Sequence, residues 1–296
     1  MKNLRGHARP PEDFRAVLEM KMTDETPLYN TVAPLRNVAA MVSLLQRVQN
    51  RAHGLPGMAV FYGPSGWGKT TAAVYAANKF SAYQVQVKST WTARKFCEAT
   101  LADMGIKPAR TIADMVDQIS EELAISGKPL IIDEADHLVA RRCIELARDI
   151  YESSGAPVLL IGEEELPQKL QQWERVHGRM LDWVAAQPGT ITDVAHLAKI
   201  YCPKVTLAAD LSEYLLKVSN KSIRRICVNL ERVHEFAQTK DMQQISMKDW
   251  GRNGFFTGQA PAARRDVACG RDATRRKRSM PRFSMLWAWG ISRRGN

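Results

Sequence analysis

The chain has 296 residues, 45% of them hydrophobic, which is enough for one large domain with a sizeable core and a smaller second one. It has no run of about 18 apolar residues, and its basic N-terminus lacks the apolar stretch of a secretory signal, so we expect neither a membrane span nor export. Five scattered cysteines without a C-x-x-C pair favour a reducing cytoplasm and argue against a disulfide framework or a zinc site.

The net charge of +11 is unevenly distributed along the chain. Residues 264–296 carry ten Lys or Arg against two Asp, so most of the excess lies in this C-terminal segment. A basic chain would ordinarily indicate a polyanionic partner. This segment shows neither helical nor strand periodicity, and it reads either as a disordered basic arm or as a cloning or reading-frame artefact. We therefore predict a basic, disordered tail over 251–296.

Residues 1–35 are polar and interrupted by prolines, and we predict an N-terminal arm there. Apolar residues spaced three and four apart then predict a helix over 38–52. Beyond it, short apolar runs alternate with helical patterns. The runs predict strands at 58–62, 84–87, 130–132 and 157–161, with a weaker fifth at 190–197. The helical patterns predict helices at 69–80, 92–104, 111–126, 139–153 and 165–186.

Alternation of strands and helices predicts an α/β fold with a parallel five-stranded sheet flanked by helices. From about residue 206 the pattern becomes all-helical, with predicted helices at 207–218, 223–239 and 246–250. This change predicts a small helical lid domain after the α/β domain. We place the α/β domain at 36–204 and the lid at 205–250.

Residues 63–70 read Gly-Pro-Ser-Gly-Trp-Gly-Lys-Thr, a complete G-x-x-x-x-G-K-[ST] phosphate-binding loop between a predicted strand and a predicted helix. Its glycines let the backbone N–H groups turn toward phosphate oxygens, and the following helix N-terminus adds positive potential. Lys69 would reach the β- and γ-phosphates, and the Thr70 hydroxyl would ligate Mg²⁺. A glycine-rich turn with an incidental Lys-Thr is the alternative. The predicted ATP-binding residues here are Gly63, Pro64, Ser65, Gly66, Trp67, Gly68, Lys69, Thr70 and Thr71.

Leu130-Ile131-Ile132-Asp133-Glu134 has the apolar-then-acidic pattern of a Walker B strand. Asp133 would hold Mg²⁺ directly or through water, and Glu134 would polarise the attacking water as a general base. An apolar strand that ends in acidic loop residues is common, so the motif alone is weak. About sixty residues after a P-loop, with one strand between them, it predicts ATP hydrolysis.

Together these residues resemble the AAA+ ATPase family over roughly residues 35–240. The resemblance implies a sensor-1 position after the fourth strand, where Glu163 replaces the usual Asn, Thr or Ser. A carboxylate there would repel phosphate unless it were protonated or turned away. The resemblance also implies an arginine finger acting on a neighbouring subunit, with Arg179 as first choice and Arg175 as second, and a sensor-2 residue, Arg224. A solvated surface arginine is the alternative for both fingers. A finger supplied in trans implies a homo-oligomer, either a ring or a helical filament.

Within that family, residues 133–138 and 144–166 are similar to the TnsC, TniB and phage Mu B group of transposition ATPases. This resemblance implies an ATP-dependent protein that coats double-stranded DNA without sequence preference, recruits and activates a transposase, and leaves the DNA on hydrolysis. It also implies that the protein is located in the cytoplasm of a bacterial host cell.

Sequence-neutral DNA binding requires Lys, Arg and hydroxyl groups directed at phosphates. In ring and filament ATPases, the segments after the second strand and after the Walker B strand lie near the central pore. An ordinary solvated basic surface is the alternative for both segments. The predicted DNA contacts are Lys88, Thr90, Arg94, Lys95, Arg141 and Arg142.

Two other functions stay open. One is a different AAA+ role, such as a secretion-associated ATPase or a replication initiator or loader, although we find no apolar 20-residue segment and no helix-turn-helix pattern after residue 240. The other is a nucleotide-switched scaffold with slow or no hydrolysis. The Asp133–Glu134 pair argues against the scaffold, and Glu163 argues for it.

Overall fold

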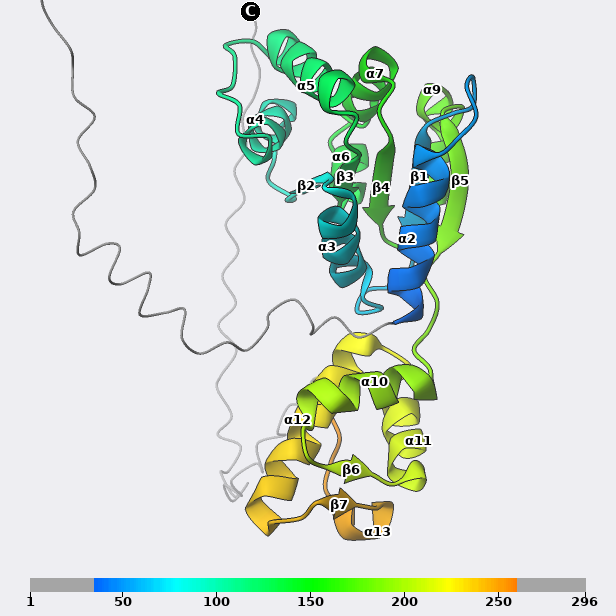
Figure 1. Cartoon of the computed structure of the whole chain (residues 1–296), viewed down its shortest axis with the longest axis vertical. Helices are drawn as coiled ribbons and strands as arrows, with labels where there is room; N and C mark the ends of the chain where they lie inside the picture. The colour runs from blue at the N-terminus through cyan, green and yellow to red at the C-terminus, as the bar shows by residue number, and fades with distance from the viewer. Residues whose placement is uncertain (1–34, 260–296) are drawn as a thin grey trace, which may run out of the picture. The chain divides into compact units, whose positions relative to one another are not determined.

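The computed structural model describes residues 35–259 (Figure 1). Its centre is a five-stranded sheet in which every neighbouring pair of strands is parallel. The strand order is β2-β3-β4-β1-β5. Strands β3 and β4 are buried along their whole length, as their continuous apolar runs predict for a parallel sheet covered on both faces. The strands are β1 (Met58–Tyr62), β2 (Tyr83–Gln86), β3 (Leu130–Asp133), β4 (Val158–Gly162) and β5 (Met180–Ala185).

Helices cover both faces of this sheet, so the predicted fold class is confirmed. Alternate residues of β1 belong to different hydrophobic clusters: Ala59 and Phe61 to one, Met58 and Val60 to the other. The first cluster includes side chains of α2 and α3, and the second includes side chains of α4, α5 and α7. The helices are α2 (Arg36–Gln49), α3 (Lys69–Phe80), α4 (Ala93–Asp103), α5 (Ile112–Ser126), α6 (Asp136–Ala140), α7 (Glu145–Ser154), α8 (Leu166–Gln171) and α9 (Glu174–His177).

The fifth strand was predicted in the wrong place. Residues 190–197 form part of helix α10 (Ile191–Tyr201), because Thr190 and Asp193 build a reciprocal capping box that starts a helix. The predicted helix over 165–186 is also wrong: it contains two short helices, α8 and α9, followed by strand β5. Strand β5 is only half-buried and has neither clear alternation nor a continuous apolar run, so its sequence resembles that of a helix.

The predicted helix over 139–153 is divided as well. Helix α6 ends at Ala140 and α7 begins at Glu145. Between them, Arg142 has a φ of 56°, a left-handed conformation that a continuous α-helix does not contain.

The C-terminal part of the described chain is helical, with α11 (Ala209–Val218), α12 (Ile223–Lys240) and α13 (Met247–Trp250), close to the predicted ranges. Helix α10 packs against α11 and α12, so it forms part of this bundle. Two short strands, β6 (Thr206–Leu207) and β7 (Gln244–Ile245), pair in parallel beside the helices. The predicted boundary at 204/205 stays a prediction.

Phe255 and Phe256 pack on these helices, although residues 251–259 were predicted to belong to the disordered tail. The buried Asn229 amide donates to the Phe256 carbonyl oxygen at 3.0 Å and accepts the Phe256 N–H at 2.7 Å. The Phe255 ring also stacks on Trp250. The rest of the predicted tail, with Cys269, and the predicted N-terminal arm up to residue 34 lie outside the described residues. None of the described helices is long and apolar enough to cross a membrane.

Candidate functional site

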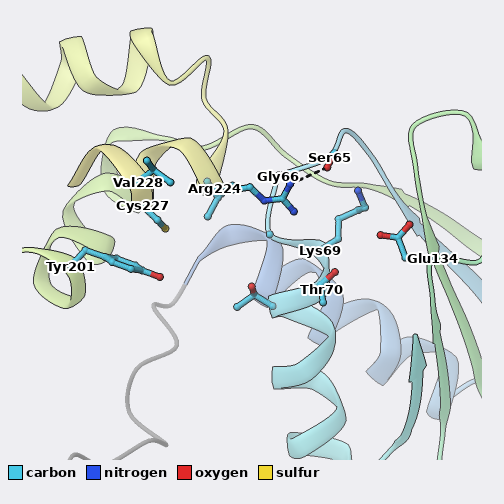
Figure 2. Close-up of a pocket in the computed structure, with 12 residues that line it drawn as sticks. Ser65, Gly66, Lys69, Thr70, Glu134, Tyr201, Arg224, Cys227 and Val228 are labelled. Atoms are coloured by element: carbon cyan, nitrogen blue, oxygen red, sulfur yellow. Dashed lines mark hydrogen bonds between the residues drawn. The ribbon is translucent and has the colours of Figure 1, made fainter. Parts of the chain in front are cut away.

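The glycine-rich loop connects the carboxyl end of β1 to the first residue of α3 (Figure 2). Gly66 and Gly68 both have a φ of 81°, a conformation that costs glycine little and other residues more. Gly68 is also the N-cap of α3, where no side chain occupies the first free N–H groups. The loop therefore has the strand–loop–helix geometry that favours phosphate binding at a helix N-terminus.

Lys69 folds back over this loop. Its ammonium group donates hydrogen bonds to the carbonyl oxygens of Gly63 at 2.6 Å and Pro64 at 3.0 Å. Burial lowers the pKa of Lys69 from its ordinary value, while the carboxylates of Glu134 and Asp133 oppose that shift. The acidic neighbours therefore favour the charged ammonium group at the mouth of the loop, where it can meet phosphate oxygens.

Asp133 ends strand β3 and is 1% exposed. One of its carboxylate oxygens accepts the Glu134 N–H at 2.9 Å, and the other has no hydrogen-bond partner among the described residues. Burial raises the pKa of Asp133, and the Thr70 hydroxyl opposes that shift. A buried carboxylate oxygen without a partner, close to a threonine hydroxyl, fits the oxygen ligands that Mg²⁺ requires. Thr70 and Asp133 are thus the residues that would hold the ion.

Glu134 follows directly and has a φ of 58°, a rare conformation for a non-glycine residue. Burial raises the pKa of its carboxyl group, and the neighbouring Asp133 adds to the rise. Figure 2 shows the Glu134 carboxylate on the side of the cavity where the Lys69 ammonium group lies. A raised pKa and a position at the cavity suit a general base.

Helix α12 closes the cavity from the lid side. The Arg224 N–H donates to the Gly66 carbonyl oxygen at 3.0 Å, and the Ser222 hydroxyl donates to the same oxygen at 3.2 Å. The Arg224 guanidinium lies 3.5 Å from the Ser65 hydroxyl oxygen (Figure 2). These contacts bring the predicted sensor-2 residue to the P-loop.

The cavity between the P-loop and the lid has a volume of about 320 Å³, within the range of small-molecule sites. Four of the lining residues were not predicted. Two of them, Cys227 and Val228, follow Arg224 by three and four residues on α12, and this spacing puts them on the same helix face, so it could have predicted them. The lining residues are Ser65, Gly66, Gly68, Lys69, Thr70, Thr71, Glu134, Arg224 and the unpredicted Tyr201, Ile223, Cys227 and Val228.

The remaining predicted catalytic residues do not line this cavity. Glu163 is exposed, and its backbone N–H is bound by Asp136. Arg175 is exposed on α9. Arg179 precedes β5, and its carbonyl oxygen accepts the N–H of Met58 at the start of β1, so it lies at the amino ends of these strands, whereas the P-loop follows the carboxyl end of β1. A role for either arginine in a neighbouring subunit's site stays a prediction.

The structure brings the two predicted DNA-binding segments together. The Arg141 guanidinium donates to the Ser89 carbonyl oxygen at 2.7 and 3.1 Å, which ties the segment after β3 to the segment after β2. Arg94 is bound to Glu98 at 2.8 Å and to the Arg110 carbonyl oxygen, and Lys95 lies 3.8 Å from Glu98.

The other three predicted contacts are exposed: Lys88, Thr90 and Arg142. Among the described residues, none forms a hydrogen bond or an ion pair with any of these three side chains. We call Lys88, Thr90, Arg94, Lys95, Arg141 and Arg142 the basic surface.

The sheet order, the P-loop and the Asp133–Glu134 strand end define the fold of an AAA+ P-loop NTPase. Residues 52–170 match a protein-family model described as an AAA domain. The AAA+ part of the predicted resemblance is therefore confirmed. The narrower likeness to transposition ATPases stays a prediction. No curated protein matches the sequence significantly.

Several solved structures are similar in fold to this chain. The ORC2 protein of Aeropyrum pernix in its ADP form is 16% identical, with a TM-score of 0.53 over 74% of this chain and 68% of that one. Cdc6p from Pyrobaculum aerophilum is also 16% identical, with a TM-score of 0.53 over 76% and 68%. The ORC1 protein of A. pernix in complex with DNA is 19% identical, with a TM-score of 0.51 over 74% and 65%. The chain thus spans about two thirds of their length, and these similarities show the fold alone.

Proposed function

We propose that this chain is an ATPase that uses its nucleotide state to control binding to DNA. The observation that carries the ATPase part is the unpartnered, buried Asp133 oxygen, which lies next to a P-loop whose lysine is already folded over the phosphate site. When bound, Mg²⁺ would neutralise charge on the phosphate oxygens. Lys69 would hold the terminal phosphate, and Glu134 would orient a water molecule and accept its proton.

The basic surface supports the DNA-binding part of the proposal. Its exposed cations and hydroxyl are suited to phosphate oxygens, and contacts to phosphate carry no sequence information. We propose Lys88, Thr90 and Arg142 as the direct contacts, because their side chains are not engaged by other described residues. Arg141 would hold the two segments in register, and Arg94 and Lys95 would contribute less.

We propose further that the protein assembles on double-stranded DNA and recruits a transposase, with Arg179 or Arg175 acting on the nucleotide of the next subunit. The resemblance of residues 133–138 and 144–166 to transposition ATPases supports this reading. A replication initiator is the second candidate, and the solved ORC and Cdc6 structures of similar fold favour it. The two candidates differ in how they occupy DNA.

Electron microscopy and filter binding with duplexes of several sequences and lengths separate them. With a non-hydrolysable ATP analogue, the transposition reading predicts a protein coat that lengthens with the duplex and has no sequence preference. An initiator is expected to occupy one preferred sequence with a fixed number of subunits. Absence of DNA binding in the presence of the analogue would refute both.

A Glu134→Gln variant tests the hydrolysis step. We expect ATP turnover to fall by about 100-fold or more, because the general base is lost, while nucleotide binding is retained. The variant should also remain on DNA longer than the wild type after ATP addition. Glu121→Gln, an exposed residue on α5, is the matched control and should turn over ATP like the wild type.

A further inference from the structure

A second buried carboxylate lies three residues after Asp133 and does not line the nucleotide cavity. Asp136 is the first residue of α6 and is 9% exposed. One of its oxygens accepts the backbone N–H of Glu163 at 2.6 Å, and the other accepts the Lys169 ammonium group at 2.9 Å. Both carboxylate oxygens are thus engaged, one by the loop after β4 and one by helix α8.

The chain is closely packed at this point. A side chain at Gly162 would collide with the Asp136 carboxylate and with Leu166, so glycine permits the approach. The Gly162 carbonyl oxygen in turn accepts the N–H of Gly63 in the P-loop at 3.3 Å. The Ala135 N–H, in the Walker B turn, donates to the carbonyl oxygen of Ile161 at 2.8 Å. The Walker B turn, the end of β4 and the P-loop are therefore connected by consecutive hydrogen bonds.

Lys169 supplies the counter-charge for this carboxylate. Its hydrogen bond to Asp136 raises the pKa of the Lys169 ammonium group, which favours the charged form that the carboxylate binds. Glu165 lies 3.7 Å from the same ammonium group but is 80% exposed. The negative charges of Asp136 and Glu163 also favour the protonated form of Lys69 and so oppose the lowering of its pKa by burial. Both carboxylates therefore lie within electrostatic range of the P-loop lysine.

We infer that Asp136, held by Lys169, is a positioning residue for ATP hydrolysis: it fixes the loop that begins at Glu163 against the turn that carries Glu134. The bond is made to the Glu163 backbone, so it does not depend on the unusual Glu163 side chain. This inference rests on the hydrolysis step of the proposed function. It does not require DNA binding.

The test measures steady-state ATP turnover without DNA, together with ADP affinity and thermal unfolding. Asp136→Asn is nearly isosteric but loses the charge and replaces one acceptor oxygen by a donor. We expect kcat to fall about tenfold or more, with KM and ADP affinity within about twofold of the wild type. Lys169→Met should lower kcat in the same way, and Lys169→Arg should restore most of it. Glu165→Gln should leave turnover unchanged.

Wild-type turnover in Asp136→Asn and Lys169→Met would overturn the inference. A parallel loss of kcat, ADP affinity and thermal stability would also overturn it, since a purely structural role would affect all three. If Asp136→Asn does not fold, Lys169→Met and Lys169→Arg test the inference in its place, with the same measurements of kcat, ADP affinity and thermal stability. An active wild type that fails to bind DNA would refute the proposed DNA function alone. A wild type without any turnover would refute both.

Discussion

The nucleotide cavity and the basic surface differ in what fixes their functional groups. In the cavity, the backbone fixes the functional groups: the conformations of Gly66 and Gly68 shape the loop, and Lys69 is bound to loop carbonyl oxygens. On the basic surface, the functional groups are at the ends of long side chains. Two of these, Arg94 and Arg141, are bound to groups of their own chain. The first region is therefore organised before its ligand arrives, whereas the second has only part of its charge available.

The largest expected effect is in the cavity. Lys69→Ala should weaken ATP binding by roughly 30- to 150-fold, because hydrogen bonds to charged groups contribute about 2 to 3 kcal/mol. Titration with a fluorescent ATP analogue measures this. Lys79→Ala, near the exposed end of the same helix, is the control and should bind like the wild type. Equal binding by Lys69→Ala would mean that the loop holds phosphate through its backbone alone.

The cavity is also secured from α2, by a buried side chain that we did not predict. The Asn37 amide donates to the carbonyl oxygens of Trp67 and Gln187, both at 2.8 Å, and accepts the Gln187 N–H at 2.7 Å. Asn37→Leu should lower the free energy of unfolding by about 1 to 3 kcal/mol, because it removes the partner of three part-buried backbone groups. It should also weaken ATP binding, since the Trp67 carbonyl belongs to the P-loop.

Chemical denaturation and the same nucleotide titration measure the two effects. Asn50→Ala, at the exposed C-cap of α2, is the control and should change stability by less than about 0.5 kcal/mol. A destabilised Asn37→Leu variant with normal ATP affinity would show that α2 supports the fold without organising the loop.

The same contrast explains which parts of the molecule the sequence could predict. Contiguous motifs with fixed spacing identified Lys69, Asp133, Glu134 and most strands, because their geometry depends on local backbone conformation. Asn37 was missed because its partners are 30 and 150 residues away. The fifth strand was misplaced because β5 is a half-buried edge strand, and its sequence carries little periodic signal. The Arg94–Glu98 ion pair, by contrast, has the i,i+4 spacing that favours pairing on a helix, so the sequence carried a signal that Arg94 is not a free cation.

On the basic surface we expect smaller effects that differ between residues. Lys88→Ala and Arg142→Ala should each weaken binding to duplex DNA by roughly three- to tenfold and reduce the slope of log affinity against log salt by about 0.9. Arg94→Ala should have less effect, because its charge is shared with Glu98. Filter binding over a range of salt concentrations, with a non-hydrolysable ATP analogue, measures both quantities.

Lys240→Ala, an exposed residue at the end of α12, controls for the loss of one positive charge. If it lowers affinity as much as Arg142→Ala, the protein binds DNA through its overall charge and the basic surface is not a defined site. Equal losses in Arg94→Ala and Arg142→Ala would mean that DNA releases Arg94 from its ion pair.

The smallest expected effect concerns the cysteines and separates the cavity from the rest of the core. Burial raises the pKa of Cys97 to about 11 and that of Cys202 to about 12, so at pH 8 both remain thiols and should resist alkylation in the folded protein. Cys227 and Cys143 are less buried, and burial also raises the pKa of each. Of the four cysteines within residues 35–259, only Cys227 lines the nucleotide cavity.

We therefore expect ADP to slow the alkylation of Cys227 severalfold and to leave that of Cys143 unchanged, as followed by mass spectrometry of peptides at pH 8. Raising the pH toward 9.5 should speed both reactions, because more thiolate forms as the pH approaches a raised pKa. ADP protection of both cysteines would indicate that the nucleotide tightens the whole domain. Protection of Cys227 alone would indicate that ADP occupies the space between the P-loop and α12, where Arg224 already contacts the loop.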